Sequence, residues 1–419
     1  MNASNGFKFT AGIAALASIA TVVAPAAPAH AVDFSSGSLV VERIGTGTAT
    51  LSSAATQISI LEVTTAGSLT QTITFPTSGS DQQSDSGSAT SNGYLNTYGG
   101  FVSVPGSNAA LGTASVAGLN AKVNSLLDST GTVVTRTLFP TGGPSGTPPS
   151  PFSGNNYRAS IATSGSTFYG VGTSSGSPTT GGAWYFDGTA FNSLSGTAGA
   201  PANVTNLRTV EIYNNQLYFA SSSGTFLGVS SLGTGLPTSG PALPTLQINA
   251  GAGASTYGFV MFSTGSQGAG VLDLAYLADD RTVAGGGIQK YSYNGTAWSN
   301  SWSLLVGASG TSTLQSGTGV GFAGLRGLAG TYDSVLGASL YATTTETSNN
   351  RLISIFDTGT TTPSTYTTLQ SAGTNFVFRG VDLSPVAVPE PSTYAIAAVA
   401  TLGMAGLIRR RRRAGDSDD

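Results

Sequence analysis

The heptapeptides Tyr185-Phe186-Asp187-Gly188-Thr189-Ala190-Phe191 and Ser292-Tyr293-Asn294-Gly295-Thr296-Ala297-Trp298 are two copies of one pattern, 107 positions apart. In each copy a strand-like run leads into Asp-Gly or Asn-Gly and an aromatic residue follows. Two-residue turns of this kind need positive φ and join adjacent antiparallel strands. The heptapeptides therefore predict hairpins at equivalent places in an internal repeat.

A second recurrence is an aromatic residue or leucine followed by arginine. It occurs at Tyr157-Arg158, Leu207-Arg208, Leu325-Arg326 and Phe378-Arg379, so the gaps between the arginines are 50, 118 and 53 residues. The middle gap is about twice the others and predicts one more unit, around Phe259 to Asp273, without its arginine. A period of about 50 to 60 residues suits the three or four short antiparallel strands of a propeller blade.

Short runs of strand length recur along the chain and are bounded by Gly, Asn, Asp or Ser, which is typical of an all-β protein. Only Leu119 to Leu127 has a pattern that also fits a helix. The clearest runs are Ser38–Ile44, Ile58–Val63, Val210–Tyr213, Leu217–Ala220 and Leu352–Phe356, and the turn Asn214-Asn215 separates two of them.

From Leu39 to Leu383 the chain holds about six such units, or seven, and we predict a β-propeller. The last strand, Phe378–Leu383, has no blade of its own, so we expect it to pair with Leu39–Ile44 and close the ring. A pair of β-sandwiches or a β-helix stays open as an alternative, although the period is too long for one coil of a β-helix.

Composition excludes several chemistries. The chain has no cysteine, and its single histidine is His30. Nucleophile systems that need an imidazole or a thiolate, and ordinary zinc sites, are therefore not expected. Between Val32 and Val388 there are ten Lys or Arg and fifteen Asp or Glu, a balance that disfavours nucleic acid as a partner. We expect no cofactor and no catalytic residue.

Several side-chain groups allow a functional and a structural interpretation, and we favour the structural one each time. The recurrent arginines either bind an anionic saccharide in a channel or brace neighbouring blades. Asp279 and Asp280, with Asp273 nearby, either hold calcium or form a solvated turn. The aromatic residues Trp184, Tyr185, Trp298 and Trp302 either stack on sugars or fill the blade core.

Two further patterns carry less weight. With fifteen acids in the body, a carboxylate pair for glycoside hydrolysis stays open, but no spacing singles one out. The glycine-rich runs Gly142 to Pro151 and Gly285 to Gly287 lack the strand-to-helix setting of a phosphate loop, so we interpret them as ordinary loops.

The N-terminus has the layout of a secretory signal peptide. Lys8 precedes an apolar stretch from Ala11 to Val23, and Ala29 and Ala31 supply small residues at the positions that a signal peptidase reads. We therefore assign residues 1–31 to a signal peptide.

The C-terminus combines a short motif, an apolar segment and a basic block. Val388, Pro389, Glu390, Pro391 and Ser392 precede apolar or small residues 393–408, and Arg409, Arg410, Arg411, Arg412 and Arg413 follow without a break. Sixteen helical residues rise roughly 24 Å, slightly less than a typical bilayer core of about 30 Å. The arginines at its end favour a single membrane helix whose basic end stays cytoplasmic.

This tail resembles the PEP-CTERM sorting signal of exported proteins from Gram-negative bacteria with exopolysaccharide or biofilm systems. The resemblance covers about the last 30 residues and implies processing by a membrane exosortase. The acidic residues Asp416, Asp418 and Asp419 extend beyond the usual end of that signal. More weakly, segments such as Gln216-Leu217-Tyr218 and Phe378-Arg379-Gly380-Val381 resemble secreted propeller-like proteins of unassigned function, which implies a fold and no activity.

The sequence thus predicts three parts: a signal peptide at 1–31, a propeller body at 32–384 and a sorting and anchor tail at 385–419. The expected function is that of a non-enzymatic cell-surface or extracellular-matrix protein, held briefly in the inner membrane before processing. Its expected partners are signal peptidase, an exosortase and exopolysaccharide. The alternative is a secreted propeller that binds or cleaves carbohydrate.

Overall fold

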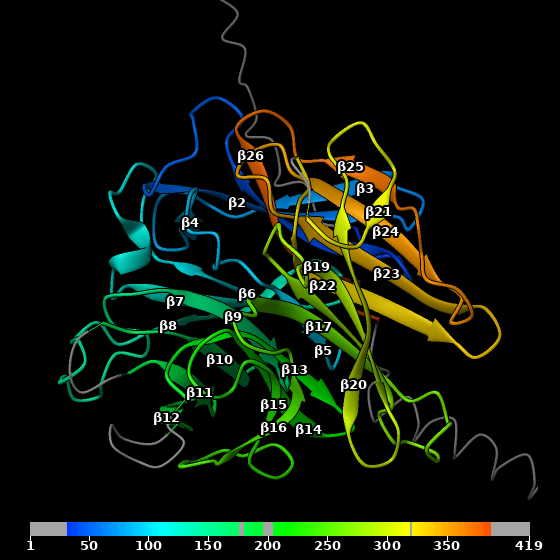
Figure 1. The fold of residues 1–419 in the computed structure, drawn as a ribbon. Helices are drawn as coiled ribbons and strands as arrows, with labels where there is room; N and C mark the ends of the chain where they lie inside the picture. Colours follow the sequence, from blue (N-terminus) through cyan, green and yellow to red (C-terminus); the bar gives the residue numbers. More distant parts are fainter. Residues whose placement is uncertain (1–31, 176–179, 196–203, 319–320, 387–419) are drawn as a thin grey trace, which may run out of the picture. The chain divides into compact units, whose positions relative to one another are not determined.

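A computed structural model describes residues 32–175, 180–195, 204–318 and 321–386 (Figure 1). The predicted signal peptide with Ala29 and Ala31 lies outside the described residues. So do the sorting motif at 388–392, the apolar segment 393–408 and the arginines 409–413. Within the described part the chain is all-β, with one short 3-10 helix at Val116–Gly118. The stretch from Leu119 to Leu127 forms a strand, not a helix, from Lys122 onward.

Four separate sheets, each made of consecutive antiparallel strands, form a propeller-like arrangement. The first contains β9 (Tyr157–Ala162), β10 (Phe168–Gly172), β11 (Gly182–Phe186) and β12 (Phe191–Ser193). The second contains β13 (Leu207–Tyr213), β14 (Gln216–Ser221), β15 (Gly228–Leu232) and β16 (Pro244–Asn249). The third contains β17 (Thr256–Phe262), β18 (Leu274–Asp279), β19 (Gly287–Tyr293), β20 (Trp298–Val306) and β21 (Leu314–Gln315). The fourth contains β22 (Leu325–Asp333), β23 (Gly337–Thr344), β24 (Arg351–Asp357) and β25 (Thr367–Ser371).

The remaining strands form one nine-stranded sheet. Its members are β1 (Leu39–Gly45), β2 (Ala55–Val63), β3 (Leu69–Thr74), β4 (Ser84–Ser86), β5 (Asn96–Tyr98), β6 (Phe101–Ser107), β7 (Lys122–Leu127), β8 (Val133–Leu138) and β26 (Phe376–Leu383). The prediction of six or seven separate blades is therefore wrong, because the described residues form four blade-like sheets and one larger sheet. The reason is the length of β2. Its second half, Ser59–Val63, pairs with β3, and its first residues, Ala55–Gln57, pair with β4. Because β4 in turn pairs with β6, the two groups of strands form one sheet.

The last strand closes the structure onto the first, as predicted. β26 pairs antiparallel with β1, from Leu39 opposite Leu383 to Gly45 opposite Phe376. Figure 1 shows the orange β26 beside the blue strands of the N-terminal sheet. The leading strands of the sheets then contact one another in a closed succession: β5, β9, β13, β17, β22, β26 and back to β5. We call these the inner strands.

Five of the inner strands carry a β-bulge at the same register position. In β9 and β13 the extra residue is Arg158 and Arg208, and in β22 and β26 it belongs to the pairs Arg326-Gly327 and Arg379-Gly380. In β17 the bulged pair is Tyr257-Gly258, so tyrosine replaces the arginine in the unit predicted to lack it. A bulge turns a side chain away from the alternation of the strand. The arginine repeat read in the sequence is therefore a repeat of bulges.

The two heptapeptides fold alike, but their turns are longer than predicted. Phe186 pairs with Phe191 and Tyr293 with Trp298, so each loop has four residues instead of two. The carboxylate of Asp187 and the side-chain oxygen of Asn294 each accept two backbone N–H groups from inside their loop, which stabilises this wider turn. Asn214-Asn215 does form a two-residue turn, with φ of 50° and 56°.

Apolar side chains fill the spaces between neighbouring sheets. One core cluster joins the third and fourth sheets, where Tyr276, Leu340 and Ile353 are fully buried. This packing fixes β18 and β19 relative to β23 and β24, and the candidate site lies at one end of that interface.

Candidate functional site

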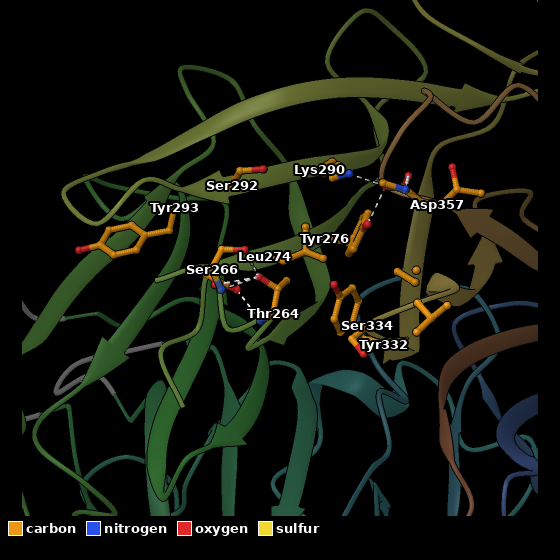
Figure 2. Close-up of a pocket in the computed structure, with 16 residues that line it drawn as sticks. Thr264, Ser266, Leu274, Tyr276, Lys290, Ser292, Tyr293, Tyr332, Ser334 and Asp357 are labelled. Carbon is orange, nitrogen blue, oxygen red and sulfur yellow. Dashed lines mark hydrogen bonds and ion pairs between the residues drawn. The ribbon is translucent and has the colours of Figure 1, made fainter. Parts of the chain in front are cut away.

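A polar cavity of about 310 Å³ lies where the third and fourth sheets meet. Tyr276 on β18 and Lys290 on β19 line one side, and Tyr332 at the end of β22 lies across from them, as Figure 2 shows. Asp357, the last residue of β24, joins the two sides. The cavity is thus built by strands more than 80 positions apart in the sequence.

The side chain of Asp357 makes three polar contacts within the cavity. Its Oδ2 accepts a hydrogen bond from Tyr276 Oη at 2.6 Å and forms an ion pair with Lys290 Nζ at 2.8 Å. Its Oδ1 accepts the backbone N–H of Gly359 at 2.8 Å. The carboxylate side chain has no exposed surface, so these three donors replace the water that it loses on folding.

Lys290 and Tyr276 form a small aromatic and ionic cluster around this carboxylate. Lys290 Nζ lies 6.0 Å from the ring centre of Tyr276 and 5.9 Å from that of Trp302, within range of a cation–π attraction. Burial, together with the hydrogen bond to Asp357, raises the pKa of the Tyr276 phenol well above its usual range. Tyr276 therefore stays protonated and acts as a hydrogen-bond donor at any physiological pH.

The second carboxylate of the cavity, Asp273, holds a loop in place. Its Oδ1 accepts the N–H of Thr264 at 2.7 Å, and its Oδ2 accepts the hydroxyl of Thr264 at 2.9 Å and the N–H of Gln267 at 3.2 Å. These contacts fix the loop between β17 and β18. Both acids of the cavity are thus committed to structural hydrogen bonds.

The chemistry of the cavity is that of hydroxyl groups and aromatic rings. Its lining includes the hydroxyls of Thr264, Ser266, Ser292 and Ser334 and the rings of Tyr293 and Tyr332. Such a surface suits hydrogen bonding and stacking with a polyhydroxylated molecule. Across the described residues, no group of three or more acids, histidines or cysteines is placed to hold a metal ion.

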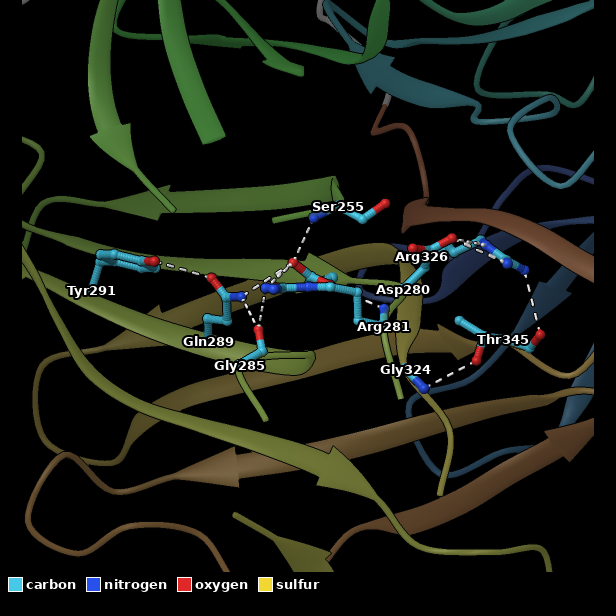
Figure 3. Close-up of polar contacts among 10 residues, drawn as sticks. Ser255, Asp280, Arg281, Gly285, Gln289, Tyr291, Gly324, Arg326 and Thr345 are labelled. Carbon is cyan, nitrogen blue, oxygen red and sulfur yellow. Dashed lines mark hydrogen bonds and ion pairs between the residues drawn. The ribbon is translucent and has the colours of Figure 1, made fainter. Parts of the chain in front are cut away.

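The aspartates considered for calcium are bound by arginines instead. Asp279 forms a two-pronged pair with Arg281 at 2.7 and 2.8 Å, and it also accepts the N–H of Ser255. Asp280 pairs with Arg326 at 3.2 Å, while Asp273 lies in the cavity described above. Figure 3 shows Arg281 beside Gly285 and Gln289, and Asp280 next to Arg326. These carboxylates therefore make structural contacts, but the predicted solvated turn is wrong for Asp279, which is fully buried and paired with Arg281.

Three of the four recurrent arginines brace neighbouring sheets, as we favoured, and Arg208 does so by donating to the hydroxyl of Tyr257 in the third sheet. The fourth, Arg379, bonds next to β4 of its own nine-stranded sheet. Arg158 of β9 donates to the side chain of Asn206 and to the carbonyl of Leu207, both next to β13. Arg326 of β22 reaches Asp280 of the preceding sheet, and Arg379 of β26 donates to the carbonyl of Gly87. All four arginines are at least partly buried.

The aromatic residues considered for sugar stacking belong to the packed interior or its edge. Trp184 is buried, and its indole N–H donates to the carbonyl of Thr180 at 2.9 Å. Trp302 packs against Tyr276, while Tyr185 and Trp298 are half-buried. The two glycine-rich runs are loops, between β8 and β9 and between β18 and β19.

Sequence reasoning missed the residues that define the cavity. Asp357 follows a strand that was predicted, but nothing in the sequence relates it to Tyr276 or Lys290 on the preceding sheet. It also missed three buried ionisable residues, Glu42, Asp85 and Lys122, because they occupy ordinary strand positions. A charged residue inside an apolar run, as at Glu42 within Val40–Ile44, is the one signal available.

Comparison with known proteins assigns the C-terminus. A family model described as the PEP-CTERM protein-sorting motif matches residues 387–413. The chain carries a PEP-CTERM protein-sorting motif. The motif indicates export, membrane-associated sorting and processing by an exosortase. The resemblance seen in the sequence is thereby confirmed for the tail.

The body has weaker likenesses. No curated protein matches the chain. Among solved structures, one similar chain is a putative oxidoreductase (glucose dehydrogenase) of Thermus thermophilus, with 12% identity and a TM-score of 0.34 over 81% of this chain and 99% of that one. A likeness at this level carries no argument about fold or activity. In the part of the chain that the structure describes, no helix is long and apolar enough to cross a membrane.

Proposed function

We propose that this PEP-CTERM protein is a non-enzymatic component of the cell surface or extracellular matrix of a Gram-negative bacterium. After removal of the signal peptide, the chain is held in the inner membrane by its tail until an exosortase processes it, and the body is then presented to exopolysaccharide. The observation that carries this proposal is the sorting motif at residues 387–413. The matrix role and the lack of enzymatic activity are our inference from the features below.

We infer that the nine-stranded sheet, although continuous, combines two blades, which together with the four separate sheets gives a count of six. In this count the nine-stranded sheet contains two blades, β26-β1-β2-β3 and β5-β6-β7-β8, joined through β4. Each blade then contributes one inner strand to the closed succession of contacts. The first blade combines strands from both ends of the body, which is the usual way for a propeller to remove free edges.

Two features support a non-enzymatic role. The carboxylates of the polar cavity between the third and fourth sheets, Asp273 and Asp357, are each held by several hydrogen bonds, so neither is free to act as a general base. The body also lacks histidine and cysteine. A chain with few charged residues and much Gly, Ser and Thr suits a structural component of a hydrated matrix.

The sorting step is tested by the mass of the mature protein. The full chain is expressed in a host with an exosortase and in the same host with the exosortase gene deleted, and intact masses are compared. We expect loss of Arg409–Arg413 only when the enzyme is present. Changing Pro389 and Pro391 to alanine should abolish processing, whereas Pro385→Ala, just before the matched residues, should not. An unprocessed tail in both hosts would refute the sorting assignment, and a processed protein absent from the matrix fraction would refute the matrix role.

A second candidate function is carbohydrate binding, and the hydroxyl- and tyrosine-lined cavity favours it. Tyr332 lies on the wall facing Tyr276 and is part-exposed. A panel of neutral and acidic oligosaccharides is titrated against the purified protein and the Tyr332→Ala variant. Binding that weakens about tenfold in the variant supports this function, since loss of ring stacking costs about 1 to 2 kcal/mol. No binding by the unmodified protein rules it out.

A further inference from the structure

The six inner strands bring together one residue each, five of them at a bulge and the sixth just before β5. The set consists of Arg158, Arg208, Tyr257, Arg326 and Arg379 from the five bulged strands, together with Tyr94, which precedes β5 and forms a bridge with Ala159 next to Arg158. We call these six residues the arginine collar.

The collar is formed where the inner strands approach most closely. A Cβ added to Gly258 would lie 2.8 Å from the carbonyl oxygen of Arg326, one added to Gly327 would lie 2.5 Å from that of Arg379, and one added to Gly380 would lie 2.9 Å from that of Gly93. Glycine after the collar residue therefore lets the backbones touch. This applies to three of the six collar residues, because Leu95, Ala159 and Thr209 follow the other three.

The side chains of the collar meet around Tyr257. Its ring lies 5.5 Å from that of Tyr94, and the guanidinium carbons of Arg208 and Arg326 lie 4.5 and 5.7 Å from its centre. Arg208 also donates a hydrogen bond to the Tyr257 hydroxyl. Cations from two different sheets thus converge on one phenol.

The positive charge of the collar exceeds the negative charge bonded to it. Among the described residues, Arg326 is the one collar arginine with an ion pair, to Asp280. Arg158 and Arg208 donate to neutral oxygens alone. Burial, and then the neighbouring charge of Arg208, lowers the pKa of Arg158 to about 10, which still leaves Arg158 protonated at neutral pH.

Neither of the two nearby acids forms an ion pair with a collar arginine among the described residues. Glu42 and Asp85 lie close to Arg379, but burial raises the pKa of both carboxyls, and for Glu42 it does so strongly. Neither oxygen of Glu42 has a hydrogen-bond partner in the described structure, so no donor stabilises its ionised form. Buried guanidinium groups without a counter-charge are costly, which favours an anion supplied from outside.

Donors for such an anion are present. The Nε of Arg158 is buried and has no partner within the described chain. The hydroxyl of Tyr257 accepts from Arg208, so its own proton is available for donation. Arg208 is only half-buried and gives access from solvent. A planar guanidinium fork next to a phenol suits the oxygens of a carboxylate or a phosphate.

We propose that the arginine collar is a binding site for an oxyanion, either a carboxylate of an acidic sugar or inorganic phosphate. The site lies among the inner strands and is separate from the cavity at Asp357. The proposal does not depend on the matrix role or on the sorting step.

The test is calorimetric titration of the purified protein with three probes: inorganic phosphate, a galacturonate trisaccharide and the neutral maltotriose. We expect one anion or both to bind, maltotriose not to bind, and affinity to fall as salt is raised. Binding of phosphate alone identifies a phosphate site, and binding of the trisaccharide identifies an acidic-sugar site. Failure of both anions, or equal binding of maltotriose, overturns the proposal.

Two variants locate the site. Arg208→Gln should weaken anion binding about tenfold or more, because a charge-assisted hydrogen bond and one positive charge are lost. Tyr257→Phe keeps the ring between the arginines and should weaken binding severalfold through loss of one donor. Arg136→Gln on the outer strand β8 makes the same charge change away from the collar and should bind as the unmodified protein does. Thermal melting checks that each variant is folded, and unchanged affinity in both collar variants would refute the site.

Discussion

Replacing Asp357 with asparagine removes one charge from the centre of the cavity between the third and fourth sheets. The asparagine oxygen can keep the hydrogen bond from Gly359, but Lys290 loses its counter-charge while only 11% of its side chain is exposed. A charge-assisted hydrogen bond contributes about 1.5 to 3 kcal/mol, and a buried charge left unpaired costs about as much again. We therefore expect Asp357→Asn to lower the free energy of unfolding by about 3 kcal/mol.

The pairing with Lys290 is separated from other effects by a double-mutant cycle. Lys290→Met alone should cost about 2 kcal/mol, because Asp357 keeps its bonds from Tyr276 and Gly359, and the double variant should cost about 3 kcal/mol, giving a coupling of about 2 kcal/mol. Urea denaturation followed by tryptophan fluorescence measures each value. Asp81→Asn, at an exposed carboxylate that accepts a hydrogen bond from the neighbouring Ser80, is the control and should not shift the midpoint. If the double variant loses as much stability as the two single variants together, the reasoning is refuted.

Three other predictions concern the inner strands. Asn96→Ala should lower the free energy of unfolding by about 2 to 4 kcal/mol, because the Asn96 amide donates to two buried carbonyls, of β9 and β13, at 3.0 Å each; equal denaturation midpoints would contradict this. Gly327→Ala should destabilise by about 2 kcal/mol or more, since the new Cβ would lie 2.5 Å from the carbonyl oxygen of Arg379. Gly118→Ala, whose added Cβ would have its nearest neighbour 3.8 Å away, is the control, and equal melting temperatures of the two variants would contradict the steric reasoning. Burial raises the pKa of Asp382 to about 7, so the folded protein keeps a proton that the unfolded chain releases above about pH 4. Stability should therefore fall as pH rises from 4 to above 7, by about 1 to 2 kcal/mol once the partial exposure of Asp382 is allowed for, and Asp382→Asn should flatten the profile in a pH series of urea titrations.

The repeat carried most of what the sequence revealed about the fold. Hairpin patterns and the spacing of arginines identified the β class, the inner strands and the pairing of the last strand with the first. These features are local in the sequence or repeat along it, so they can be detected from a single sequence. The count of separate sheets failed at β2, because the pairing of its first residues with β4 depends on strand length, which the pattern Ile58–Val63 underestimates.

The cavity at Asp357 could not be predicted in the same way. Tyr276, Lys290 and Asp357 come together only when two sheets pack, and each occupies a position where a polar residue at a strand end or edge is ordinary. The arginines were found in the sequence, but the bulges that direct them were not, because a bulge is a property of the partner strand as well. Tyr257 was missed because it replaces the arginine of the sequence repeat, although β17 has the same bulge as the other inner strands.

The pairing of β26 with β1 has a consequence for the order of events during export. Residue 39 reaches the far side of the membrane long before residue 383. The edge of β1 that pairs with β26 therefore has no partner until nearly the whole body has been translocated. Only three residues separate the end of β26 from the matched sorting motif at 387. A chain that is truncated before Phe376 lacks both the closing strand and the sorting motif, so the same final segment completes the fold and carries the signal for sorting.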